Sequence, residues 1–488
     1  MSKYIRIKEL ERLIEPHLFN DLTEDEYKVE KVVSTELLKW SRLDIAFKLM
    51  FLDNKAKGKF VKEIYEKHIK AFTFGSFVEY GSLNKNSSEK YIESFHKTFN
   101  DIKNNGFEKE KSVLPLSINQ SILNGAHRLA SAIYLKKKVD CVFLDLEDQI
   151  YDYKFFATRH LSEDILEIAV SKFIEYSDNT HIAFIWPTAQ GFDEDIENLI
   201  PNIIYRKEVK LNRNGARNLL SQIYYGEDWL GDADNDFNGS NGKLVECFKT
   251  FDPIRVIAFQ EENLEKALVI KYRIRDVFKI GKHSIHITDT KEEAIRTSRI
   301  IFNDNSIHFL NYAKPNKYKS THIKIAKFKE FLNDNKIEND KVIVDSSLIL
   351  SAYGLREAVD TDYLMDDTCN FESEVPLINS HDESLEWYKK LKNELIYNPN
   401  HYFYFNDIKF VSFSLLYSMK KKRGEVKDKN DCKMMDALIE DNRIKKIFSK
   451  LNQDLFYFKV KNKTRFMKLF RMLGVYRIAR WFYRLTLK

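Results

Sequence analysis

Short apolar segments that suit β-strands alternate with helical segments along the whole chain, and this alternation constrains the fold more than any other feature. We expect strands near 113–116, 140–144, 182–186 and 342–344, and helices near 91–104 and from residue 126. This order favours α/β or α+β modules over one sandwich or one helix bundle. With only 15 Gly and 8 Pro in 488 residues, long flexible linkers are excluded.

The length predicts about three domains at roughly 100–200 residues each. We place a helical N-terminal region at 1–75, modules at 76–150, 175–315 and 325–455, and a basic tail at 459–488. We find no internal repeat. Hydrophobic residues make up 43% of the chain and charged residues 31%, so each module can form a packed core.

The cysteines and the apolar runs predict a cytoplasmic protein. The four cysteines lie far apart with no CxxC pair, which argues against a zinc site or a disulfide framework. The N-terminus lacks the apolar stretch of a signal peptide. No run of 18 apolar residues is present that would cross a membrane.

Charge is concentrated at the C-terminal end. Residues 459–488 hold ten Lys or Arg and no acid, which leaves 69 basic and 73 acidic residues elsewhere, a net charge of −4. That balance argues against a nucleic-acid groove across the body. The tail combines apolar stripes with Arg, Lys and Trp481, so we expect it to lie on an anionic surface such as the inner membrane. Packing of the tail on the body is the alternative.

A first candidate site is the segment Asn124-Gly-Ala-His-Arg. Gly125 allows a tight turn, and His127 and Arg128 then stand at a helix start that favours anions. A capped helix start with a surface Arg is the alternative.

Segment 87–132 around this motif resembles the ParB/sulfiredoxin-like nucleotide-binding domain, over about residues 75–147. The resemblance implies that Gly125, His127 and Arg128 hold nucleotide phosphates. Kinases of this family use an upstream acid as base, for which Glu79 is the candidate.

A second candidate site lies in segment 273–294. His286 follows an apolar strand residue, and Thr288 and Asp289 lead into a helix. An imidazole with one nitrogen held and one free is a good phosphoryl acceptor. Arg275 offers charge to phosphate. A structural His beside a helix cap is the alternative.

This segment is similar, position for position, to the active-site stretch of nucleoside diphosphate kinases, and the resemblance extends over about 181–312. It implies a ferredoxin-like module with a phosphohistidine at His286 and a phosphate-binding Arg275. Trp186 departs from the family, because the first strand carries a phosphate-binding Lys there. That departure leaves a dead scaffold as the alternative.

A third candidate site spans 342–364. A strand is followed by Ser346 and Ser347, a helix, and then Asp360 and Asp362. Carboxylates at this spacing suit Mg²⁺, and hydroxyls at a helix start suit phosphate. A solvated Asp-x-Asp turn is the alternative.

Over about 340–440 the pattern resembles polymerase-beta-type nucleotidyltransferases, which implies catalysis and metal binding by Asp360 and Asp362. Asp407 is the candidate third ligand. Asp345 stands where that family has Gly. The charged run 420–431 suggests phosphate contacts, or a solvated helix face.

Together these segments predict an α+β multidomain enzyme of phosphoryl or nucleotidyl transfer that uses Mg²⁺ and a nucleoside triphosphate, ATP or CTP. One scheme has it activate a small-molecule acceptor for surface-polysaccharide biosynthesis. Two alternatives stay open. One is a ParB-like nucleotide-binding protein that binds DNA, and the other is a non-catalytic membrane-docked scaffold of glycan biosynthesis.

Overall fold

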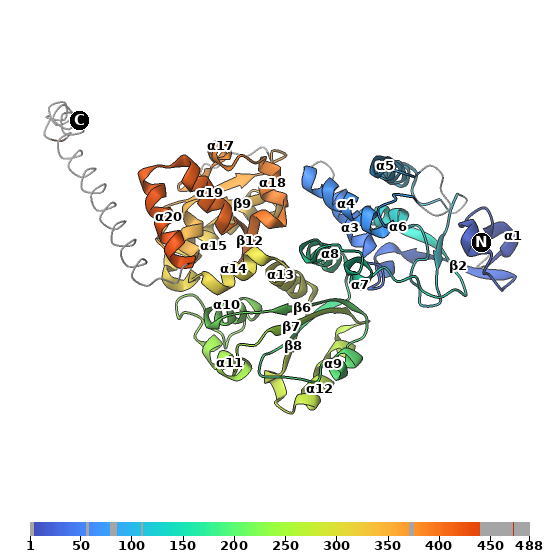
Figure 1. The fold of residues 1–488 in the computed structure, drawn as a ribbon, viewed down its shortest axis with the longest axis horizontal. Coiled ribbons are helices and arrows are strands. Elements are labelled where there is room, and N and C mark those ends of the chain that lie inside the picture. The colour runs from blue at the N-terminus through green and yellow to red at the C-terminus, as the bar shows by residue number, and fades with distance from the viewer. Residues whose placement is uncertain are drawn as a thin grey trace.

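The computed structural model is a mixed α+β protein with three small sheets, which confirms the predicted class (Figure 1). It describes residues 4–54, 58–78, 85–108, 111–369, 375–439 and 472. Glu79 and, apart from Met472, the tail 459–488 lie outside these residues.

The first sheet joins strands from both sides of the boundary expected at residue 75. Its order is β1 (Tyr4–Arg6), β2 (Glu26–Val33), β4 (Lys138–Phe143) and β3 (Leu114–Leu116). β2 pairs with β4 antiparallel and β3 pairs with β4 parallel. Residues 1–75 are therefore not a separate helical region. Their longer helices are α3 (Asp44–Asn54) and α4 (Lys59–Phe72), which pack with α5 (Ser88–Asn105) and α6 (Ala126–Tyr134).

The second sheet has the order β6 (Ile203–Val209), β7 (Ile254–Gln260), β5 (Thr180–Ile185) and β8 (Ile285–Ile287). All neighbouring strands are antiparallel. Helix α9 (Asp193–Leu199) follows β5, while α10 (Arg213–Ile223) and α11 (Gly239–Cys247) lie between β6 and β7. Helix α12 (Leu264–Phe278) connects β7 to β8, and α13 (Lys291–Ile301) follows β8.

The third sheet has the order β11 (Ile378–Ser380), β10 (Thr361–Met365), β9 (Val342–Asp345), β13 (Ile408–Val411) and β12 (Tyr402–Phe405). β9 is antiparallel to β10 and parallel to β13. The helices of this unit include α15 (Lys319–Asp334), α16 (Ser347–Ala352), α18 (Lys392–Tyr397), α19 (Phe413–Arg423) and α20 (Val426–Ile439).

Side-chain alternation along β5 gives the second sheet a core on each face, because successive strand residues point to opposite sides. Ile182 and Phe184 join a large core that also contains residues of the first unit. Ala183 and Ile185 join a smaller core with residues of α9 and α12. The first two units are therefore packed into one body rather than strung on linkers.

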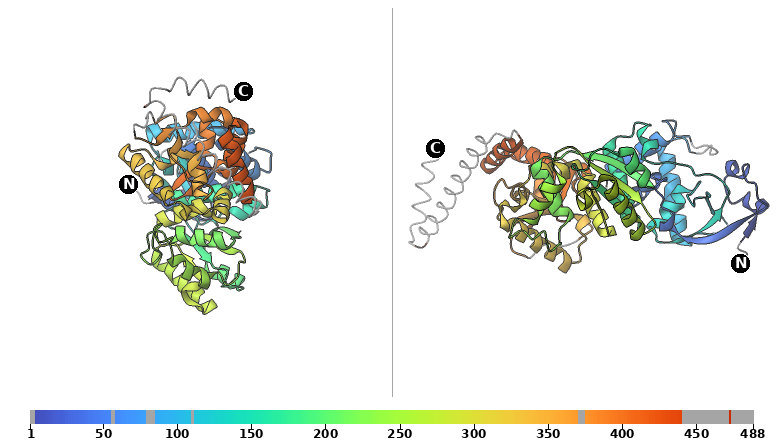
Figure 2. Two further views of the ribbon diagram at one scale, coloured as in Figure 1. Left: turned by 90° about the vertical axis from the view of Figure 1, so that its left-hand side faces the viewer. Right: turned by 90° about the horizontal axis from the view of Figure 1, so that it is seen from below.

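Two helices lie where the three units meet. Helices α8 (Glu163–Tyr176) and α13 contact each other, and Figure 1 shows them between the blue, green and orange parts of the chain. Helix α13 also contacts β12 of the third sheet, as does α14 (Asp304–Tyr312), which packs on α10 as well. Figure 2 shows the first and third units at opposite ends of the long axis.

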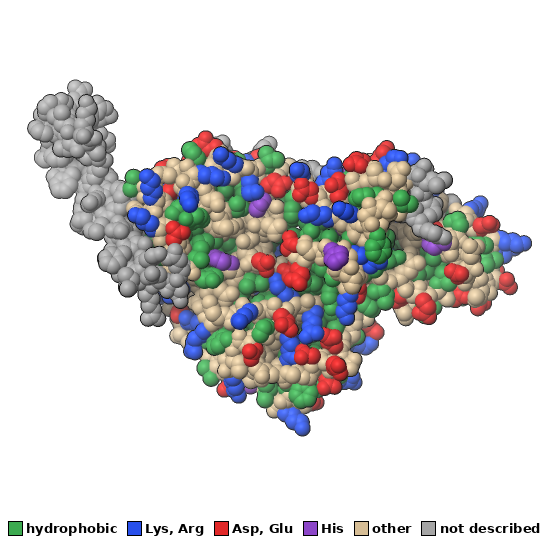
Figure 3. Space-filling view, in the orientation of Figure 1, with side chains coloured by type: hydrophobic (Ala, Val, Ile, Leu, Met, Phe, Trp, Pro, Cys, Tyr) green, Lys and Arg blue, Asp and Glu red, His purple; other side chains and the backbone are tan. Residues whose placement is uncertain are grey.

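The surface carries both charge signs intermixed. On the face in Figure 3, Lys and Arg side chains alternate with Asp and Glu rather than gathering in one basic patch. Among the described residues, no helix is both long enough and apolar enough to cross a bilayer.

Candidate functional site

His286 is the middle residue of β8, and strand alternation sets its direction. Its neighbours Ile285 and Ile287 belong to the core with α12, so His286 faces the opposite side of the sheet. There the Tyr224 ring packs edge-to-face with the imidazole, and the two ring centroids are 5.0 Å apart. Only 8% of His286 is exposed. The imidazole is therefore held at the wall of a cleft and not on the open surface.

Glu293, in the first turn of α13, orients the imidazole. Its Oε1 lies 2.9 Å from Nε2 of His286, and its Oε2 accepts a 2.7 Å hydrogen bond from the backbone N–H of Asp289. A carboxylate at Nε2 assigns the proton to that nitrogen and leaves the lone pair on Nδ1. Within the described part of the chain, the His286 ring makes no second hydrogen bond.

The carboxylate that holds His286 stays ionised. Burial raises the pKa of Glu293, but the hydrogen bond from His286, the backbone N–H of Asp289 and the charge of Arg296 together outweigh it, so the pKa lies below its ordinary value. An ionised Glu293 keeps the Nε2 proton in place and stabilises positive charge on the ring.

An open cleft of about 730 Å³ lies in front of His286. Five cationic side chains line it, against four carboxylates: Lys243, Lys271, Arg275, Lys282 and Arg296. The Nε atoms of Arg275 and Arg296 are buried and have no hydrogen-bond partner among the described residues. The cationic side chains of this lining offer charge to an anion such as a phosphate. His286 and Arg275, both predicted site residues, line this same cleft.

Lys243 enters this cleft from α11, while Trp186 stays out of it. Trp186 is fully buried and stacks on Phe184, so it offers the cleft no charge. The Lys243 ammonium lies 5.5 Å over the Tyr224 ring and donates to the backbone oxygen of Lys282 at 3.0 Å. Burial lowers the pKa of Lys243, and three neighbouring cations add to this effect. The cleft therefore concentrates positive charge that is not fully neutralised.

The first predicted site has the expected turn, but its side chains contact protein groups. Gly125 caps α6 with φ of +91°. Arg128 donates to Glu15 at 3.0 Å and to the Ser112 hydroxyl. His127 Nε2 lies 2.8 Å from the Tyr65 hydroxyl.

Burial, followed by the charge of Lys48, lowers the pKa of His127 far below its usual value, so this ring is neutral. Because Arg128 already donates to Glu15, a phosphate at the Gly125 turn would have to compete with Glu15 for Arg128.

The third predicted site is built around Asp345 instead of the Asp-x-Asp pair. Asp345 is fully buried and accepts hydrogen bonds from His381 Nδ1 at 2.8 Å, Ser384 at 3.1 Å, Ser346 N at 2.6 Å and the Tyr388 hydroxyl. Burial raises the pKa of Asp345, but these bonds, first that of His381, bring it below its usual value. The same bond raises the pKa of His381 against burial.

The proposed metal ligands are not gathered into one group. Asp362 lies directly across the strand pair from Asp345, and burial followed by Asp360 raises its pKa. Asp360 accepts from the Ser347 hydroxyl at 3.2 Å. Among the described residues, no set of three His, Cys, Asp or Glu side chains is placed to hold a metal ion.

Asp407 cannot join Asp360 and Asp362, which corrects its assignment as a metal ligand. It lies in the turn between β12 and β13, with φ of +60°, and its carboxylate is 3.8 Å from Lys329 Nζ. Because β13 runs parallel to β9, its first residue lies at the opposite end of the sheet from Asp345. The residues present therefore do not fit a Mg²⁺ site at this position.

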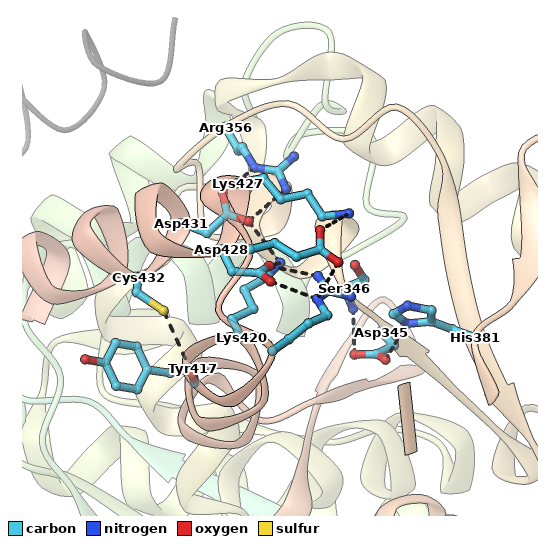
Figure 4. Close-up of polar contacts among 12 residues, drawn as sticks. Asp345, Ser346, Arg356, His381, Tyr417, Lys420, Lys427, Asp428, Asp431 and Cys432 are labelled. Carbon is cyan, nitrogen blue, oxygen red and sulfur yellow. Dashed lines mark hydrogen bonds and ion pairs between the residues drawn. The ribbon is translucent and has the colours of Figure 1, made fainter. Parts of the chain in front are cut away.

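Part of the charged run at 420–431 is a buried network, not a solvated helix face. Lys420 Nζ lies 3.3 Å from Asp428 and 2.9 Å from Asp431, and all three side chains are at most 1% exposed. Arg356 and Arg423 each hold one of these aspartates with two hydrogen bonds (Figure 4). These residues position α19 against α20.

Sequence reasoning missed Glu293 and the Asp345–His381 pair. Glu293 had a local signal, because Thr290 and Glu293 have the spacing of a helix capping box and the Thr290 hydroxyl accepts from Glu293 N at 3.1 Å. His381 is 36 residues from Asp345, and no local pattern joins them.

Comparisons of the chain with protein-family models, curated proteins and solved structures find no match.

Proposed function

We propose that this protein is a phosphotransferase that carries a phosphoryl group on Nδ1 of His286. The observation that carries the proposal is the pairing of Nε2 with Glu293, which leaves the other ring nitrogen with its lone pair beside a cleft rich in Lys and Arg. The phosphoryl donor is a nucleoside triphosphate, ATP or CTP, whose Mg²⁺ arrives with the substrate. The acceptor is a small molecule with a hydroxyl or phosphate group.

In the first step, Nδ1 of His286 attacks the terminal phosphorus, and the bond from that phosphorus to the bridging oxygen breaks. The nucleoside diphosphate leaves with the electron pair. Glu293 keeps the proton on Nε2 and stabilises the cationic ring. In the second step, an acceptor oxygen attacks the phosphorus, the P–N bond breaks, and Nδ1 regains its lone pair. A hydroxyl acceptor releases its proton to water.

The topology of the second unit supports this proposal. Two βαβ-type halves give strands β5, β6, β7 and β8 with the antiparallel order β6-β7-β5-β8, which is the arrangement of a ferredoxin-like unit. Placing His286 on the last strand of such a unit agrees with the expected nucleoside diphosphate kinase-like module. Nucleotidyl transfer at the third unit has less support, because it rests on Asp360 and Asp362 alone.

The test is the intact mass of the protein after incubation with MgATP, MgCTP or MgGTP. We expect the gain of one phosphate that is labile to acid and absent from His286→Gln. His283→Gln is the matched control, because His283 lines the same cleft and should remain dispensable.

Glu293→Gln should lower the rate of phosphate incorporation at least tenfold, since an amide cannot balance the charge on the ring. No phosphate on the wild-type protein, with nucleotide binding shown by calorimetry, would refute the proposal and make His286 a structural residue. Phosphate incorporation that persists in His286→Gln would show that another side chain is phosphorylated.

The wider prediction is that the transferred phosphate activates a building block for a surface polysaccharide. Incubating the phosphorylated protein with a panel of sugars, polyols and amino acids tests it. A phosphorylated product from one class would identify the acceptor. If the phosphate is lost only to water, the result contradicts the prediction that the acceptor is a polysaccharide building block.

A further inference from the structure

A second cavity lies at the junction of the three units, away from the His286 cleft. Its volume is about 370 Å³, which is within the range of small-molecule sites. Its walls come from α3 and α4 of the first unit, from α8 and α13, and from β12 and β13 of the third unit. A ligand here would contact all three units at once.

The charged groups of this cavity neutralise one another. Lys172 Nζ lies 2.7 Å from both Asp53 and Glu175. Arg299 is 2.8 Å from Asp340.

Two further lysines complete the set of cations. Lys409 Nζ donates to the backbone oxygens of Asp340 and Ile396 at 2.6 and 2.7 Å, and Lys341 pairs with Glu338 at 3.5 Å. Four cations therefore face four carboxylates in the lining. A ligand that brought its own net charge would disturb this balance at a desolvation cost.

Aromatic side chains, four of them tyrosines, form much of the remaining wall. Six rings line the cavity: Phe60, Tyr134, Phe302, Tyr397, Tyr402 and Tyr404. Tyr402 and Tyr404 lie two residues apart on β12, so they project to the same side of the sheet. Carboxylates have several acceptor sites each and can take additional hydroxyl donors while they remain paired. Phe60, Tyr134 and Phe302 provide apolar ring surface between these polar groups. Lys409 lies over one face of the Tyr397 and Tyr402 rings, and Arg299 lies over one face of the Tyr404 ring.

We propose that this junction cavity binds a neutral polyhydroxylated small molecule, a sugar or a polyol. Such a molecule combines apolar C–H faces for the rings with hydroxyl groups for the carboxylates and tyrosines. It also adds no charge to a neutral lining. Because the cavity does not touch His286, this ligand is distinct from the phosphoryl acceptor, and the proposal does not depend on the chemistry of His286.

The test uses saturation-transfer difference NMR and thermal unfolding of the full chain with millimolar neutral sugars and polyols, such as glucose, galactose, ribitol and inositol. Glucose 6-phosphate and glucosamine serve as charged matches. We expect at least one neutral compound to give saturation transfer and to raise the unfolding temperature. The charged matches should bind at least tenfold more weakly.

Two variants locate the binding. Ser171, on α8, lines the cavity without a charge, and Ser171→Phe should fill it and abolish saturation transfer, whereas Ser171→Ala should keep it. If Ser171→Phe does not fold, Tyr404→Phe removes a single hydroxyl from the wall and should weaken binding severalfold.

Three results would overturn the proposal. The first is that no neutral compound gives saturation transfer with the wild-type protein. The second is tighter binding of a charged analogue, and the third is binding that is retained by folded Ser171→Phe. Phosphate incorporation at His286 is measured separately, so failure of either proposal leaves the other standing.

Discussion

The buried charge network of the third unit permits a quantitative prediction. Replacing Lys420 with Met removes the ammonium that lies 3.3 Å from Asp428 and 2.9 Å from Asp431, while the methionine keeps most of the side-chain volume. Both aspartates are fully buried, so they cannot recover water as a partner.

Removing one partner of a buried ion pair costs about 3–5 kcal/mol, because it leaves an uncompensated charge. Here each aspartate keeps an arginine: Arg356 Nε lies 2.7 Å from Asp431, and Arg423 Nε lies 2.8 Å from Asp428. We therefore expect the free energy of unfolding to fall by the lower end of this range, about 3 kcal/mol. With a urea slope of about 1–3 kcal/mol per molar, the midpoint of the third unit falls by about 1–3 M.

The assay is urea unfolding followed by circular dichroism, with hydrogen exchange of residues 413–439 to assign the loss to α19 and α20. Lys266→Met is the matched control, since Lys266 of α12 pairs at 2.7 Å with Glu262, just before the helix, but both side chains are more than half exposed. Its midpoint should not change. A loss below about 1 kcal/mol in Lys420→Met would refute the reasoning and show that the two arginines neutralise the aspartates by themselves.

Three further predictions concern residues of the first and third units. Gly125→Ala should destabilise the first unit by about 1–2 kcal/mol in urea unfolding, because φ is +91° and a Cβ would lie 2.6 Å from Leu114; an unchanged midpoint would contradict this. Ser346→Gly should stabilise the third unit by about 1 kcal/mol, since Ser346 has φ of +60° and ψ of −125°, and Ser347→Gly should not. The pKa of His381 is higher in the folded protein than its unfolded value of 6.5. Its contribution to folding stability is therefore complete below pH 6.5 and is lost as the pH rises through the folded pKa. The urea midpoint of the wild type should therefore decrease as the pH rises above 6.5. If the midpoint of a His381→Asn variant depends on pH in the same way, His381 is not the cause.

Local pattern alone placed two strands of the second unit. The strand expected at 182–186 is β5, and the imidazole expected after an apolar strand residue is His286 on β8. Strand and helix periodicity depend on neighbours in sequence, so they can be inferred before any tertiary contact is known. The same holds for Gly125, whose left-handed conformation follows from its place before α6.

Partners distant in sequence were decided only by the tertiary structure. Arg128 was expected to hold phosphate, but Glu15, 113 residues away, accepts from its guanidinium. Asp407 was grouped with Asp362 by residue type, but the parallel pairing of β13 with β9 puts it at the other end of the sheet. The strand β2 was missed within a region that looked helical, because its partner β4 begins about a hundred residues later.

The sequence by itself determined which residues are strands and helices around His286, because those patterns are short-range. Only the tertiary structure decided that Glu293 holds Nε2, that Lys243 and Arg275 converge on one cleft, and that Asp345 is paired with His381. The physical reason is that a side chain's charge, burial and hydrogen bonds depend on what the folded chain places beside it, and strand order and helix packing set those neighbours.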